Sequence, residues 1–251
     1  MALAAFTPRN FTKDELTKEL KTAEQLHAAL EFQNSERVLA LGISALDEVL
    51  PQQGLVYGSV VELQVSGASG AATSFALCAC RAAQSNAGML SGEHGAESNR
   101  QSTRQWCAFI DPSASLFAPG VARLGVELDH LLVVRPDVEA VERIAVRIAE
   151  AKIVSILVVD LRGALGDLAV DVRRWQRTVR RLALAVKQLS TCVLVITPAA
   201  PRHALPLPVA MRLEFKRLST DSFEIRVAKE RTGRVSSPRT VAWSALEGAA
   251  P

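Results

Sequence analysis

The sequence lacks the features that would assign it to a simple class. Its formal net charge is only +3 at pH 7, too small to indicate nucleic-acid binding from charge alone. Aromatic residues make up 5% of the chain, with a single tyrosine, so few side chains are available for base stacking. No stretch approaches the roughly 20 apolar residues of a membrane span, and no signal-peptide pattern opens the chain. We therefore expect a cytoplasmic protein without a membrane partner.

Metal-binding and disulfide patterns are missing as well. The four cysteines show neither CxxC nor Cys/His ligand spacing, and each lies in apolar surroundings. They indicate buried free thiols in a reducing compartment and predict no metal site. Apolar residues, in contrast, are plentiful: 49% of the chain is hydrophobic and 22% charged, enough for a full core.

Apolar strands alternate with helical segments along most of the chain. Because fully apolar strands are buried on both faces, this alternation predicts an α/β fold with a mostly parallel central sheet flanked by helices. We expect strands at 59–65, 106–110, 131–134, 154–159, 191–196, 210–218 and 222–229, and helices at 43–50, 72–84, 118–124, 138–152 and 171–189.

The chain divides into three predicted parts. Residues 1–34 form an N-terminal helical arm, 35–235 a core with a flexible insertion near 86–105, and 236–251 a C-terminal tail. In the tail we favour a closing strand over a short anchor peptide. The arm carries a narrow apolar stripe at helical spacing, which could dock on the chain's own body or on a neighbouring subunit. The stripe consists of Leu16, Leu20, Leu26 and Leu30.

The first long strand and the first long helix are joined in the layout of a phosphate-binding loop, but the chemistry of the loop is missing. Val65 replaces its first glycine, whereas Gly70 keeps the second. Ala71 replaces the lysine that reaches the phosphates, and Ala72, before Thr73, replaces the hydroxyl that binds Mg²⁺. Hydrogen bonds to charged groups contribute about 1.5–3 kcal/mol each, so losing the lysine alone predicts at least about tenfold weaker nucleotide binding.

Asp160 ends a buried strand, at the position where a Walker-B acid would hold Mg²⁺. Without the lysine and the hydroxyl of the loop, we favour a structural role in which this carboxylate caps neighbouring amides.

Four segments in one order resemble the bacterial recombinase RecA over roughly residues 35–235. They are Gly54-Leu-Val-Tyr-Gly-Ser-Val-Val-Glu62, Cys107-Ala-Phe-Ile-Asp111, Leu157-Val-Val-Asp160 and the segment 182–191. The resemblance implies a RecA-like P-loop core preceded by an N-terminal helix.

The departures from RecA are concentrated at its functional positions. The glutamate that activates water in such recombinases is replaced by Ser113, and the resemblance places shortened or replaced DNA loops at 161–171 and 197–208. RecA's C-terminal domain has no counterpart. Lys229 and Arg231 resemble the paired basic residues that RecA places across its subunit interface.

A RecA core degraded in this pattern is similar to the ImuA family of bacterial mutagenesis cassettes. The resemblance implies a non-catalytic accessory role, without a cofactor, in the SOS response to DNA damage and in translesion synthesis. It implies as partners RecA, whose filament the chain would restrain, and ImuB, a Y-family polymerase homologue that leads to an error-prone replicative-type polymerase. The alternatives are a residual ATP- or DNA-binding RecA paralogue, a scaffold for ImuB alone and a SulA-like division inhibitor.

The predicted helix at 171–189 is strongly basic. It carries six basic residues up to Lys187 and no acid after Asp171. This pattern is compatible with contact to DNA phosphates or to an acidic partner surface. Few aromatics and the missing DNA loops argue for weak direct DNA binding at most. The outward stripe consists of Arg173, Arg177, Arg180 and Arg181.

Overall fold

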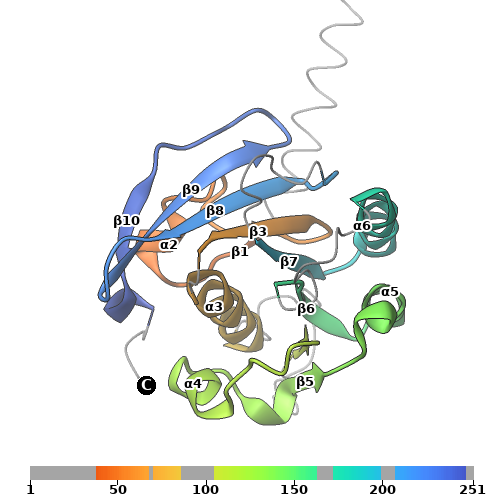
Figure 1. Ribbon diagram of the computed structural model, residues 1–251. Helices are drawn as coiled ribbons and strands as arrows, with labels where there is room; N and C mark the ends of the chain where they lie inside the picture. The colour runs from red at the N-terminus through yellow and green to blue at the C-terminus, as the bar shows by residue number, and fades with distance from the viewer. Residues whose placement is uncertain (1–37, 68–69, 86–104, 163–171, 199–206, 247–251) are drawn as a thin grey trace, which may run out of the picture. The chain divides into compact units, whose positions relative to one another are not determined.

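The computed structural model describes residues 38–67, 70–85, 105–162, 172–198 and 207–246 (Figure 1). These residues belong to one compact unit. The expected N-terminal helix with its leucine stripe lies outside them, as does nearly all of the insertion near 86–105.

Eight strands form a single sheet in the order β10-β9-β8-β3-β7-β6-β4-β5. Every pair from β8 to β5 is parallel, and only β9 and β10 are added antiparallel. The predicted mostly parallel sheet is therefore confirmed. Its strands are β3 (Val60–Ser66), β4 (Trp106–Ile110), β5 (Leu131–Val134), β6 (Val154–Asp160), β7 (Cys192–Pro198), β8 (Met211–Arg217), β9 (Ser222–Glu230) and β10 (Arg239–Ala242).

Helices cover both faces of the sheet (Figure 1). Alternate residues of one strand face different layers: Ile156 and Val158 of β6 pack into the cluster of α3, whereas Leu157 and Val159 pack into that of α5 and α6. This double burial explains why β6 is a continuous apolar run. The helices are α2 (Ser44–Asp47), α3 (Ala71–Ser85), α4 (Ala118–Arg123), α5 (Val141–Ala151) and α6 (Val172–Val186).

Several predicted boundaries shift. The helix expected at 43–50 is helical only over Ser44–Asp47, and the one expected at 138–152 opens with a 3-10 turn, Val138–Ala140. A small antiparallel pair, β1 (Val38–Leu39) and β2 (Leu55–Val56), lies outside the main sheet. The two helix differences lie at the ends of elements, where sequence periodicity is least informative; the β1–β2 pair was not predicted, because strands of two residues have no periodicity of their own.

The C-terminal segment contributes to the core. Strand β10 pairs with β9, as expected of a closing strand, and Val241 and Leu246 are buried. Trp243 packs against Phe223, with ring centroids 4.9 Å apart and ring planes tilted by 50°. Part of the expected tail thus completes the sheet.

All four cysteine thiols are buried and unpaired. Burial raises the pKa of Cys78 to about 11 and that of Cys192 to about 12, because a thiolate is poorly solvated in an apolar interior. This agrees with the predicted buried free thiols. Among the described helices, none combines the length and the apolar character needed to cross a membrane.

Gly58 allows the turn before β3 to pass beneath the end of α6. Its φ is +72°, and its amide donates to the carbonyl of Thr191 at 2.8 Å. A Cβ atom at this position would lie 2.8 Å from the carbonyl oxygen of Lys187. The residue must therefore be glycine for two separate reasons, its backbone conformation and the lack of space.

We predict that Gly58→Ala lowers the free energy of unfolding by about 3 kcal/mol, since strain and a backbone clash add. Gly233→Ala is the control, because Gly233 has a φ of +84° but no atom within 4 Å of its Cβ position. That variant should lose only about 1–2 kcal/mol, the cost of the left-handed conformation. Urea unfolding measures both, and equal losses would contradict the role assigned to the close contact.

Candidate functional site

The candidate site lies at the carboxyl edge of the parallel strands, where α/β sheets commonly bind ligands. Strand β3 ends there at Ser66 and leads towards α3, and β6 ends there at Asp160. On the neighbouring strand β4, the chain continues into Asp111. The parallel register therefore brings two buried carboxylates and the start of α3 to one edge.

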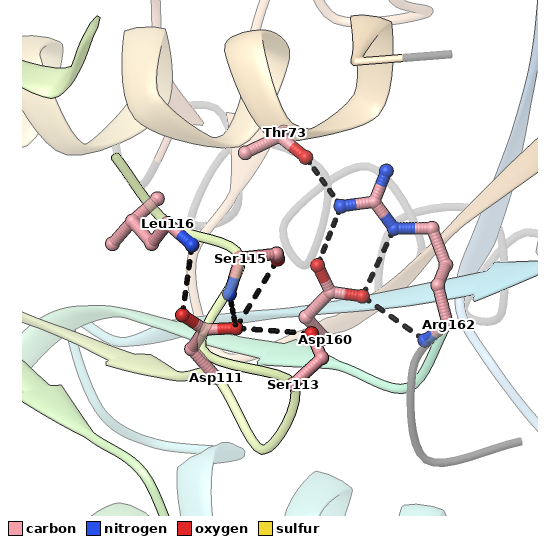
Figure 2. A network of polar contacts seen from close by, with 7 residues as sticks. All are labelled: Thr73, Asp111, Ser113, Ser115, Leu116, Asp160 and Arg162. Atoms are coloured by element: carbon pink, nitrogen blue, oxygen red, sulfur yellow. Dashed lines mark hydrogen bonds and ion pairs between the residues drawn. The ribbon is translucent and has the colours of Figure 1, made fainter. Parts of the chain in front are cut away.

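Asp160 forms an ion pair with Arg162 (Figure 2). The guanidinium donates from Nε to Oδ1 at 3.0 Å and from Nη2 to Oδ2 at 2.5 Å. Nη2 also donates to Oγ1 of Thr73 at 2.6 Å, which ties the end of β6 to the first turn of α3. Asp160 is only 1% exposed, so this geometry supplies the counter-charge that a buried carboxylate requires.

The amide-capping role expected for Asp160 is confirmed, and the ion pair adds to it. The backbone amide of Arg162 donates to Oδ1 of Asp160 at 3.0 Å. No role was predicted for Arg162 from the sequence. The available signal was an arginine two residues after an acidic strand end, in a chain whose phosphate-loop position has no lysine.

Asp111 closes the turn that contains Ser113 (Figure 2). Fully buried, it accepts hydrogen bonds from the hydroxyl of Ser113 at 3.2 Å, from the amide of Ser115 at 3.0 Å and from the amide of Leu116 at 2.9 Å. Arg135 lies 3.8 Å from the same carboxylate. Ser113 therefore helps to shape a loop, and its side chain has no carboxylate with which to activate water.

Of the other residues predicted to form a degenerate phosphate loop, Val65, Ala71 and Ala72 lie in the core, whereas Gly70 is exposed. Val65 lies buried in β3, and Ala71 and Ala72 have no exposed surface. Gly70 precedes α3, and its carbonyl accepts the amide of Ser74 at 2.9 Å. The two alanine methyl groups thus belong to the packing of α3.

A cavity of about 460 Å³ lies beside the ion pair, between α3, α4 and Arg162. Most of its walls are apolar, and its polar groups are hydroxyls and the guanidinium of Arg162. In the part of the chain that the structure describes, no cluster of three or more His, Cys, Asp or Glu side chains is placed to hold a metal ion. The lining residues are Gly70, Thr73, Ser74, Leu77, Ser115, Leu116, Phe117, Gly120, Val121, Leu124 and Arg162.

The predicted basic residues lie away from this edge site. Arg177, Arg180 and Arg181 are exposed on α6, which packs on the face opposite α3; the side chain of Arg173 lies outside the described residues. Lys229 and Arg231 are exposed at the end of β9, where Lys229 donates to the carbonyl of Leu207 at 3.2 Å. The structure therefore brings Thr73 and Asp160 together at the sheet edge, whereas the predicted basic residues lie elsewhere on the molecule.

A second buried ion pair crosses the sheet. Glu62 of β3, fully buried, accepts a hydrogen bond from Nε of Arg212 on β8 at 2.7 Å and from Oγ1 of Thr197 on β7 at 2.9 Å. It fastens three strands that are adjacent in the sheet. No local sequence pattern indicates this pair, because Arg212 lies 150 residues after Glu62.

Comparison with known proteins gives one consistent relationship. The chain is 31% identical over 173 residues to Protein RecA of Gluconacetobacter polyoxogenes, covering 63% of this chain and 44% of that protein. It is 32% identical over 171 residues to the mitochondrial DNA repair protein recA homolog of Dictyostelium discoideum, covering 63% and 34%. No family model matches the chain.

Over the matched residues the chain is homologous to RecA proteins, and its mostly parallel α/β sheet is consistent with a RecA-like core. The chain spans less than half the length of these relatives.

We predict that Arg162→Met destabilises the protein by about 3 kcal/mol, because it leaves the carboxylate of Asp160 buried without its partner. The double variant Asp160→Asn/Arg162→Met should recover at least half of that loss, since no charge then remains buried. Arg135→Met is the matched control, as Arg135 is 55% exposed and 3.8 Å from its carboxylate; it should cost less than about 1 kcal/mol. Thermal unfolding measures all three, and a double variant that is as unstable as Arg162→Met, or less stable, would contradict the coupling.

Proposed function

We propose that this protein is a non-catalytic, RecA-like binding protein whose nucleotide site is closed from within by Arg162. The observation that carries the proposal is the position of the guanidinium between Asp160 and Thr73. In a working phosphate loop, a lysine and a Mg²⁺ ion supply the positive charge at this position. Here the guanidinium of Arg162 already neutralises the carboxylate of Asp160.

The energetics disfavour a bound nucleotide. A Mg²⁺–nucleotide complex would have to displace the guanidinium of Arg162 from its two partners, Asp160 and Thr73. Ala71 and Ala72 have no side-chain group that could bind the phosphates or Mg²⁺ and offset this loss. Hydrolysis would also need a general base that activates the attacking water. The resemblance to RecA places a glutamate with this role at the position of Ser113, which cannot act as such a base.

The cellular role that we propose is that of an accessory protein in damage-induced mutagenesis. A RecA-like core without ATP turnover can dock on a RecA protomer or a filament end and block its extension. Restraint of RecA would leave a stalled replication fork to ImuB and to the error-prone polymerase that ImuB recruits. The support is the homology to RecA, together with the likeness to the ImuA family in the pattern of lost functional positions.

We predict that the protein shows no saturable binding of ATP in calorimetric titration at millimolar Mg²⁺ and no ATP turnover. The physical reason is the ion pair that a nucleotide would have to break. Binding in the micromolar range, with turnover, would instead support a residual RecA-type ATPase.

We further predict that the protein slows RecA-driven strand exchange and that immobilised RecA and ImuB each retain it. A heat-unfolded sample of the same chain serves as the control. Capture by ImuB alone, with unchanged strand exchange, would favour a scaffold for ImuB. Capture by neither, with unchanged strand exchange, would contradict the proposal.

A further inference from the structure

Helix α6 presents a cationic face to solvent. Its buried side is apolar, with Trp175, Val179, Leu182 and Val186 packed against the sheet. At 3.6 residues per turn, its exposed residues fall on the opposite side over three turns. We call this surface the α6 face; it consists of Arg177, Arg180, Arg181, Leu184 and Lys187.

An exposed leucine lies in the middle of this face. Leu184 is 74% exposed, with Arg180 and Arg181 one turn before it and Lys187 one turn after it. A single exposed leucine is ordinary on a protein surface. An exposed apolar side chain with cations one turn before it and one turn after it, however, matches the apolar centre and polar rim of a protein-binding patch.

The surroundings of the α6 face suit an acidic protein segment better than a nucleic acid. Glu150 of α5, with its side chain 57% exposed, lies 3.9 Å from Arg181 and would repel phosphates and carboxylates alike. The anionic groups of a partner would therefore pair with Arg180 and Lys187 instead. Trp175, the aromatic residue of this helix, is only 7% exposed on the buried side, so it offers no ring for base stacking. Leu184 would also lack an apolar partner on a phosphate backbone.

We infer that the α6 face binds an acidic amphipathic segment of a partner protein, whose apolar side chain covers Leu184 and whose carboxylates pair with Arg180 and Lys187. The inference rests on the proposed function only in that the chain acts by binding proteins. It needs no nucleotide, because α6 packs on one face of the sheet, whereas the ion pair of Asp160 is bonded to α3, which packs on the other face.

The test is a fluorescence anisotropy titration with a short labelled peptide in which glutamates flank leucines at helical spacing. We expect saturable binding at low salt that Arg180→Glu/Lys187→Glu weakens by about tenfold or more. Leu184→Ala should weaken it by roughly fivefold, since it removes the apolar centre. A scrambled peptide of the same composition should bind far more weakly than the amphipathic one.

The matched control variants are Lys216→Glu and Leu218→Ala, which make the same kinds of change at exposed residues near the end of β8 and should leave binding unchanged. Equal binding of both peptides, or no saturable binding, would overturn the inference. So would an unaffected Leu184→Ala variant together with oligonucleotide binding that Arg180→Glu/Lys187→Glu abolishes, because the face would then be a DNA site. Neither RecA nor ImuB is present in the peptide titration, so its failure can be distinguished from a failure of the strand-exchange test.

Discussion

A carboxylate buried at the end of a central strand requires a positive charge, and in this chain Arg162 supplies it. The strand β6 fixes Asp160 at the edge of the sheet, and the guanidinium two residues later bonds both to Asp160 and to Thr73 at the start of α3. The ion pair thereby connects two elements that a Mg²⁺–nucleotide complex would connect in a working phosphate loop.

The ion pair at the sheet edge lies apart from the α6 face, the surface that we propose for partner binding. The neighbouring carboxylate Asp111 is committed to its own turn, and Glu62 is committed to joining β3, β7 and β8. The exposed cations of α6 lie on the other face of the sheet from α3. On the proposed account, partner binding therefore requires no change at the edge site, and a RecA-like scaffold serves as a rigid support for protein contacts.

The sequence predicted the sheet well because its central strands are buried on both faces and are therefore continuous apolar runs, as in β6 and β7. Helix ends were less predictable, since short turns such as Val138–Ala140 have no periodicity of their own. Arg162 was missed because its role depends on Thr73, which lies 89 residues earlier and is brought near only by the parallel register. The capping role of Asp160 was recognised because it is local, its donor being two residues away.

The central claim is that the guanidinium of Arg162 occupies the cation position of the former nucleotide site. A crystal structure determined in the presence of Mg²⁺ and a non-hydrolysable ATP analogue tests it most directly. The account predicts that Arg162 stays bonded to Asp160 and Thr73 and that no nucleotide lies at the start of α3. A bound triphosphate at that helix, with Mg²⁺ on Asp160 and Arg162 displaced from the carboxylate, would contradict it.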